Sequence, residues 1–250
     1  MTTRTSRQRP VTSGASSSPR LVWALCADAR SGSTWLSQLA ESTQLLGFPD
    51  EYLLHWEQWC VRLGLSAATA LDEYLSCLVR HRATPNGVFG IKGSLAQLEA
   101  FFRFFPGAPC VWLTRENKLE QAVSWQRAND GGLWHRTEST AAPNPVPISV
   151  ERILGFYDEI LRREALWREF FRTCPVPPLE LTYESVCRDP LAAVRAIAEY
   201  VGVAANAIEQ VSSPLQIVRD HDTAEWVRRA EQALRTRQVP SSQVGLPRQQ

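Results

Sequence analysis

The sequence predicts an α/β protein in which helices cover both faces of a central parallel β-sheet. Apolar runs of strand length alternate with longer segments whose apolar residues recur at helical spacing. The first run, 21–27 (LVWALCA), is almost continuously apolar, as expected for a strand that is buried on both sides. With 250 residues, 44% of them hydrophobic, the chain is long enough to bury such a sheet.

Turn and capping residues mark the limits of the individual elements. The turn Pro85-Asn86-Gly87 precedes a strand at 88–92, and Asn117 with Glu120 three residues later marks the start of a helix. In chain order we expect strands at 21–27, 88–92, 110–115 and 179–182, and helices at 33–44, 95–105, 117–129, 149–172 and from 190 onward.

Charge and composition argue against several classes of protein. The 27 basic and 26 acidic residues give a net charge of +1, which does not suit a general nucleic-acid binder. No apolar stretch reaches the ~20 residues that span a bilayer, and the basic start lacks the apolar core of a signal peptide. The six cysteines are scattered without metal spacing, which favours a reducing compartment. We therefore expect a cytoplasmic protein without a nucleic-acid partner or stable membrane insertion.

The two ends of the chain differ in composition from the rest. Residues 1–19 are rich in Ser, Arg, Thr and Pro and contain no acid, which is typical of a disordered basic tail, although a transit peptide has a similar composition. Residues 238–250 (QVPSSQVGLPRQQ) are also rich in polar residues and proline. The sequence thus predicts one domain, 20–237, between two disordered tails.

The segment 28–34 (DARSGST) lies where a ligand site is expected. It joins the first predicted strand to a helix, and ligands of open α/β sheets bind at the carboxyl ends of the strands. The helix start directs free N–H groups at an anion, Gly32 allows a close backbone approach, and Arg30 suits phosphate or sulfate. Without the Gly-Lys-Ser/Thr end of a Walker A loop, the segment is also compatible with an ordinary turn that caps a helix. Its hydroxyl donors are Ser31, Ser33 and Thr34.

Arg115 and Ser124 form a second candidate anion site. Arg115 ends a predicted strand and should lie at the same edge of the sheet as the loop, and Ser124 follows nine residues later on the next helix. Together they would suit a second phosphate that is held away from the loop. Alternatively, Arg115 forms an ordinary surface ion pair with Glu116 or Glu120.

Four segments together carry a resemblance to a known family. They are ARSGSTWL (29–36), FPDEYL (48–53), TPNGVFGIK (84–92) and LTRENKLEQAVSWQRAND (113–130). In combination they resemble the bacterial sulfotransferases of the trehalose 2-sulfotransferase type, which use 3′-phosphoadenosine 5′-phosphosulfate (PAPS) as sulfuryl donor. A weaker match, AEWVRR (224–229), resembles a segment that closes over the site. The resemblance implies a three-layer, P-loop-like sulfotransferase fold and, because that family tends to dimerise, a homodimer.

The resemblance also assigns roles to individual residues. Glu51 would be the general base, with Asp50 as its alternative, unless these carboxylates form only a solvated helix end. Lys92 would stabilise charge on the leaving phosphate together with Arg30, unless it is an ordinary surface residue after a strand. The scheme requires no metal. The 5′-phosphosulfate would be held by Arg30, Ser31, Gly32, Ser33 and Thr34, and the 3′-phosphate of the nucleotide by Arg115 and Ser124.

Residues for the acceptor are less narrowly defined. His55 follows Glu51 by four residues, so on a helix it would orient the base or contact the acceptor, unless it simply faces solvent. Trp56, Trp125 and Trp134 lie near the proposed site and would either stack on a ring of the acceptor or serve as packing. The trehalose enzymes tend to have larger apolar residues where this chain has Gly-Ser-Leu after Lys92. The expected acceptor is therefore a carbohydrate or another small molecule or natural product with a hydroxyl.

Two other functions remain compatible with the same residues. A P-loop phosphotransferase would use the first loop for ATP and Mg²⁺, although the missing Gly-Lys-Ser/Thr disfavours it. A non-catalytic domain would bind a nucleotide such as 3′-phosphoadenosine 5′-phosphate (PAP) without transferring any group.

Overall fold

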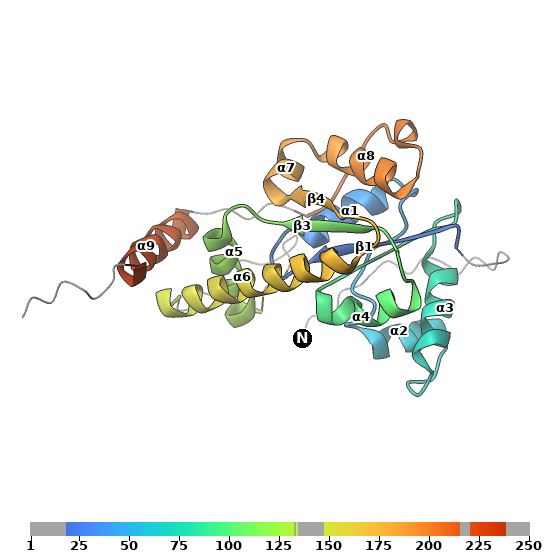
Figure 1. Cartoon of the computed structure of the whole chain (residues 1–250), viewed down its shortest axis with the longest axis horizontal. Helices are drawn as coiled ribbons and strands as arrows, with labels where there is room; N and C mark the ends of the chain where they lie inside the picture. Colours follow the sequence, from blue (N-terminus) through green and yellow to red (C-terminus); the bar gives the residue numbers. More distant parts are fainter. Residues whose placement is uncertain (1–18, 133, 135–147, 216–220, 239–250) are drawn as a thin grey trace, which may run out of the picture.

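The computed structural model describes residues 19–132, 134, 148–215 and 221–238 (Figure 1). The tails expected at 1–19 and 238–250 thus lie almost entirely outside the described residues. Within the described part, the strands form one parallel sheet in the order β2-β1-β3-β4. This confirms the α/β class with a parallel sheet. The strands are β1 (Leu21–Ala27), β2 (Val88–Gly93), β3 (Cys110–Thr114) and β4 (Leu179–Thr182).

Helices connect the strands and continue beyond them. Those expected from the sequence are present with ends shifted by at most two residues, whereas α2, α3, α7 and α9 were not predicted. In the part of the chain that the structure describes, no helix has the length and apolar composition needed to cross a membrane. The helices are α1 (Ser33–Ser42), α2 (Trp56–Leu63), α3 (Leu71–Arg82), α4 (Leu95–Phe104), α5 (Lys118–Gly131), α6 (Val150–Thr173), α7 (Tyr183–Arg188), α8 (Pro190–Val201) and α9 (His221–Gln238), with a 3₁₀ turn at Ala205–Ala207.

The two faces of the sheet are both covered, which explains the continuous apolar run of β1. Successive side chains of a strand point to opposite faces. Trp23 and Leu25 pack with α1 and α8, whereas Ala24 and Cys26 pack with α3, α4 and the second half of α6. Figure 1 shows α1, α7 and α8 on one side of the sheet and α2, α3 and α4 on the other.

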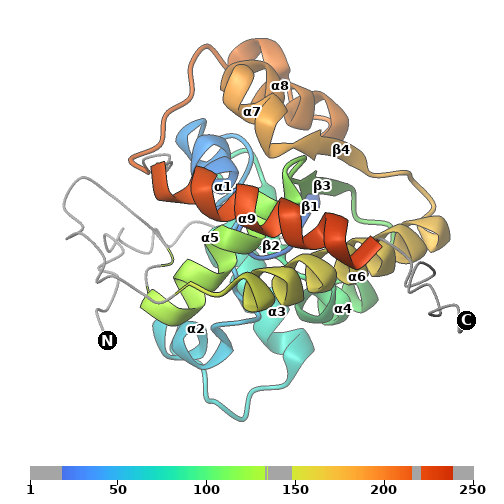
Figure 2. The same cartoon turned by 90° about the vertical axis from the view of Figure 1, so that its left-hand side faces the viewer.

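A third apolar cluster lies beyond the carboxyl ends of the strands. It joins α5, the first half of α6 and α9, with Leu119, Ile153 and Ala230 among its buried members. Figure 2 shows α9 crossing α5 and α6. Because this cluster faces the loops that leave the strands, it encloses the edge of the sheet at which a ligand site is expected.

Candidate functional site

The loop between β1 and α1 has an unusual backbone. Arg30 and Gly32 both have positive φ angles, 62° and 91°. Turns of this kind direct neighbouring N–H groups to a common point and form concave anion sites. Gly32 also lies against the ring of Tyr183, at the start of α7: a Cβ at Gly32 would come within 2.5 Å of Tyr183 Cδ2. Both the conformation and the contact therefore require glycine here.

Side chains from α5 and α6 hold this loop in place. Asp28, the first loop residue, accepts a hydrogen bond from Trp167 Nε1 (3.1 Å) and lies 3.6 Å from Nη1 of Arg163. Burial raises the pKa of the Asp28 carboxyl to about 6, although Arg163 and Trp167 act in the opposite direction. The carbonyl of Ala29 accepts from Gln121 Nε2 (2.9 Å). The loop is thus fixed on both of its sides.

Arg30 connects the loop with the second candidate anion site. Its Nε donates to Ser124 Oγ (2.9 Å), and its Nη1 donates to the carbonyl of Trp134. Burial and the nearby positive charge of Arg115 lower the pKa of Arg30 to about 10. Two arginines that repel each other favour an anion between them. The hydroxyl of Ser31, in the same loop, is buried and has no hydrogen-bond partner within the described part of the chain.

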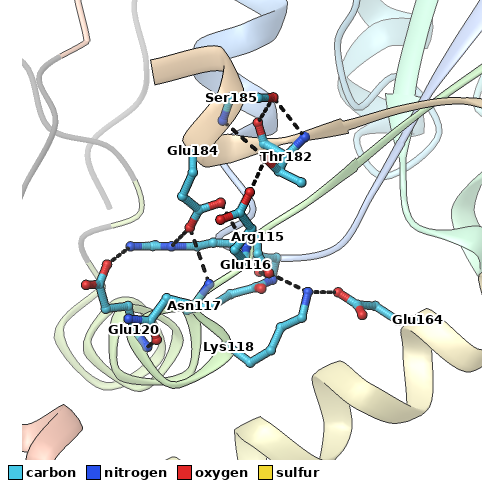
Figure 3. Close-up of polar contacts among 11 residues, drawn as sticks. Arg115, Glu116, Asn117, Lys118, Glu120, Glu164, Thr182, Glu184 and Ser185 are labelled. Carbon is cyan, nitrogen blue, oxygen red and sulfur yellow. Dashed lines mark hydrogen bonds and ion pairs between the residues drawn. The ribbon is translucent and has the colours of Figure 1, made fainter. Parts of the chain in front are cut away.

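Arg115 follows β3 and is nearly buried, with 9% of its surface exposed. Its guanidinium lies over the ring of Tyr183, 4.8 Å from the ring centroid. Its Nη2 pairs with Glu120 Oε2 at 2.6 Å, and its Nε lies 3.9 Å from Glu184 Oε1 (Figure 3). The ion pair with Glu120, considered as an alternative from the sequence, is therefore present, but in an enclosed position.

A buried lysine, Lys92, lies between Glu51 and the start of α1. Lys92 is 3% exposed, and its Nζ donates to Thr34 Oγ1 (2.8 Å) and lies 4.0 Å from Glu51 Oε1. His55 Nε2 lies 4.0 Å from the other Glu51 oxygen. The neighbouring carboxylate, Asp50, accepts from the backbone N–H of Glu51 (2.9 Å). The structure therefore places Glu51, Lys92 and the start of α1 together.

The three tryptophans considered for the acceptor, Trp56, Trp125 and Trp134, differ in their surroundings. Trp56 packs on Tyr74 with 4.3 Å between ring centroids, and Trp125 is buried and stacks on Phe156 at 5.1 Å. These contacts match the packing role that the sequence left open. Trp134 is 43% exposed, and its carbonyl is held by Arg30. Of the three, Trp134 is the most accessible to a ligand.

Several residues that form this region were not predicted from the sequence. Tyr183, Glu184 and Trp167 carry no motif, and the one available signal is that α7 begins directly after β4, at the carboxyl edge of the sheet. The segment 224–229 belongs to α9, which packs on α5 and α6. Among the described residues, no group of three or more His, Cys, Asp or Glu side chains is arranged to hold a metal ion.

Comparisons with solved structures define the class of the fold. The chain is similar to a sulfotransferase from Alicyclobacillus acidocaldarius, with a TM-score of 0.51 and 13% identity over 86% of this chain and 96% of that one. It is also similar to the sulfotransferase domain of the Synechococcus PCC 7002 olefin synthase, with a TM-score of 0.49 and 15% identity over 88% and 98% of the two chains. The first of these likenesses confirms the sulfotransferase fold.

The family of the chain is shown by a match between its amino-acid sequence and a family model. The model of the Stf0 sulphotransferase family matches residues 97–233, which is more than half of the chain, and the chain belongs to that family. No curated protein sequence matches the chain significantly. The resemblance to sulfotransferases is thus confirmed at the level of the family, and the activity class is sulfuryl transfer.

Proposed function

We propose that the chain transfers the sulfuryl group of PAPS to a hydroxyl of a carbohydrate or another small-molecule or natural-product acceptor. The observation that carries the proposal is the hydrogen bond between Arg30 Nε and Ser124 Oγ (2.9 Å). It joins the loop expected to bind the 5′-phosphosulfate to the residue expected to bind the 3′-phosphate. One nucleotide with phosphates at both positions fits this pair of sites, and PAPS enters the proposal as a substrate.

The residues of the two candidate anion sites suit PAPS as the sulfuryl donor. Arg30 and Arg115 supply positive charge, and the left-handed turns at Arg30 and Gly32 favour converging N–H groups. Among the residues that the structure describes, neither the buried hydroxyl of Ser31 nor the Nε of Arg115 has a hydrogen-bond partner, although Glu184 Oε1 lies 3.9 Å from that Nε. Buried polar groups without partners are costly, so both are suitable ligands for oxygen once the site adjusts to an anion.

Glu51 and Lys92 divide the chemical step between them. Glu51 accepts the proton of the acceptor hydroxyl while the hydroxyl oxygen bonds to sulfur and the bond from sulfur to the phosphate oxygen breaks. Lys92, between Glu51 and Thr34, stabilises the negative charge that stays on the phosphate, together with Arg30. PAP and the sulfated acceptor are the products. The transfer is expected to be in line, as in phosphoryl transfer with a loose transition state.

A transfer assay tests the proposal and its base. Radiolabelled PAPS is incubated with a panel of sugars and ring-bearing alcohols and with the wild-type protein, Glu51→Gln or Asp50→Asn. We expect Glu51→Gln to lower transfer by about 10²–10⁴-fold, because a positioned base contributes that much. Asp50→Asn is the matched control, since the amide oxygen of Asn still accepts from the Glu51 N–H.

Other outcomes separate the alternatives. Equal transfer by Glu51→Gln and the wild type would remove Glu51 as the base. PAP binding without transfer to any acceptor would favour a non-catalytic domain. Turnover of ATP that requires Mg²⁺ would favour a phosphotransferase.

A further inference from the structure

A single stretch of α6, residues 163–168, reaches the two loops of the proposed donor site. We propose that two residues of this stretch are positioning residues: Glu164 holds Arg115 in place for the 3′-phosphate, and Trp167 holds the loop 28–34 in place for the 5′-phosphosulfate. The inference rests on the proposed function, because it takes the two loops to bind one nucleotide. Neither residue belongs to the candidate anion sites, so each acts through the groups that it holds.

Glu164 reaches the backbone of Arg115 through Lys118. The side chain of Glu164 is 6% exposed, and its Oε1 accepts from Lys118 Nζ. The same Nζ donates to the carbonyl of Arg115 (Figure 3). The other oxygen of Glu164 accepts from Arg168 Nη2 at 3.3 Å. A buried carboxylate is costly unless it stays paired, so both pairs hold Glu164 in one position. The backbone of Arg115 is therefore tied to α6.

The place of Lys118 in the chain indicates a role beyond the stability of its own helix. Lys118 is the first residue of α5 and follows the N-cap, Asn117. A positive charge there is unfavourable, because it lies at the positive end of the helix dipole. The contacts of Nζ with Glu164 and with the Arg115 carbonyl offset this local cost. The lysine is thus explained by its contacts across the site.

Trp167 holds the other loop from the same helix. Its side chain is fully buried, and its Nε1 donates to Asp28 Oδ2 at 3.1 Å. Arg163, four residues earlier, lies 3.6 Å from the other oxygen of Asp28 through its Nη1. The indole stacks on Phe171, with 5.3 Å between the ring centroids and 13° between the ring planes. This packing fixes the direction of the indole N–H and, with it, the first residue of the loop.

The two contacts leave α6 three residues apart, so the helix sets the spacing of the two loops. Residues at this separation are neighbours on a helix surface. A nucleotide with phosphates at both positions needs the loops at a fixed separation, and a site that is already held in the bound geometry loses less free energy on binding. Each side chain should therefore affect the phosphate on its own side of the site.

Calorimetric titrations of PAP, 3′-AMP and 5′-AMP into the full-length protein at pH 7.5 test this inference. We expect Glu164→Gln to weaken the binding of PAP and 3′-AMP by about tenfold, and Trp167→Phe to weaken the binding of PAP and 5′-AMP by about tenfold. Partial loss of one charge-assisted contact with a phosphate implies changes of this size. The remaining nucleotide should bind each variant as it binds the wild type. Removal of a negative charge at Glu164 would by itself strengthen phosphate binding, so weaker binding reports displacement of Arg115.

Two control variants carry the same chemical changes elsewhere in the chain. Glu169→Gln neutralises an exposed carboxylate of α6 that pairs with Arg172. Trp23→Phe removes a fully buried indole whose Nε1 donates to the carbonyl of Leu46 (2.9 Å). Both should leave all three titrations unchanged.

A second variant tests the same contact if Glu164→Gln does not fold. Lys118→Met removes the ammonium group that joins Glu164 to the Arg115 carbonyl, while Arg168 still pairs with Glu164. It should reproduce the loss of affinity for PAP and 3′-AMP with 5′-AMP unchanged.

The results that overturn the inference are separable from failure of the proposed function. Equal weakening of all three nucleotides would show a merely structural role for the residue that was changed. Unchanged or tighter binding of 3′-AMP to Glu164→Gln, or unchanged binding of 5′-AMP to Trp167→Phe, would show that the residue does not position its loop. In each case the wild type still binds PAP, so the proposed function stands. Absence of PAP binding to the wild type would overturn the proposed function and this inference together.

Discussion

Replacing Gly32 with alanine should disturb both anion sites at once. The φ of Gly32 is 91°, and a Cβ there would lie 2.5 Å from Tyr183 Cδ2. The left-handed conformation costs a residue with a Cβ about 1–2 kcal/mol. The contact with Tyr183 adds about 1–3 kcal/mol, as overpacking usually does. Because Arg115 lies on the same ring, the displacement of Tyr183 also moves the proposed 3′-phosphate ligand.

Gly64 provides the matched control for this substitution. Its φ is 70°, and a Cβ would meet no atom of the described residues within 4 Å, so Gly64→Ala carries the conformational cost without the contact. We expect Gly32→Ala to be less stable than Gly64→Ala by about 1–3 kcal/mol, which lowers Tm by roughly 2–12 °C more for a chain of this size. PAP affinity should fall only in Gly32→Ala. Equal Tm values, with PAP affinity equal in calorimetry, would refute the reasoning.

Three further predictions concern buried polar groups of the site. Burial raises the pKa of the Asp28 carboxyl from 3.8 to about 6. The protonated carboxyl therefore contributes fully to the free energy of unfolding below pH 3.8, and this contribution is lost as the pH rises through about 6. Asp28→Asn removes this pH dependence. In urea unfolding, the free energy of unfolding of Asp28→Asn relative to the wild type should therefore rise by about 1 kcal/mol between pH 5 and pH 7.5. A difference that stays constant with pH would contradict the raised pKa of Asp28. Ser31→Ala should weaken PAP binding without lowering the free energy of unfolding, because the buried hydroxyl has no partner to lose among the described residues; a clear loss of stability would argue against this. Lys92→Met should lower kcat for sulfuryl transfer by about 10²-fold with little change in KM for PAPS, and an effect confined to KM would assign Lys92 to binding.

The parallel sheet and the loop after β1 could be predicted because their signals are local. The apolar run of β1 and the polar segment that follows it report burial and a turn within a few residues. The capping pair of Asn117 and Glu120 is also local, and Asn117 Oδ1 does accept from the Glu120 N–H (3.0 Å). For α3 a usable signal was present, since its buried Tyr74 and Leu78 recur at helical spacing.

The surroundings of the site depend on contacts between distant segments and could not be predicted in this way. Trp167 reaches Asp28 across 139 residues, and Glu184 reaches the backbone N–H of Glu116 across 68 residues. Neither contact leaves a pattern in the local sequence. The pair of Arg115 and Glu120 is the opposite case, because its spacing suggested an ordinary surface interaction, whereas packing against Tyr183 and the carboxyl edge of the sheet encloses it.

The most direct measurement of the central claim is a calorimetric titration of PAP in the presence of EDTA, beside an ATP control. The proteins are the wild type, Arg115→Met and Arg103→Met, the last of which removes a charge from an exposed ion pair. We expect PAP to bind the wild type and Arg103→Met with equal affinity, and more tightly than ATP binds them. The affinity of Arg115→Met for PAP should be lower by about tenfold or more. Absence of PAP binding to the wild type, or equal binding of ATP, would contradict a donor site built from the loop after β1 and Arg115.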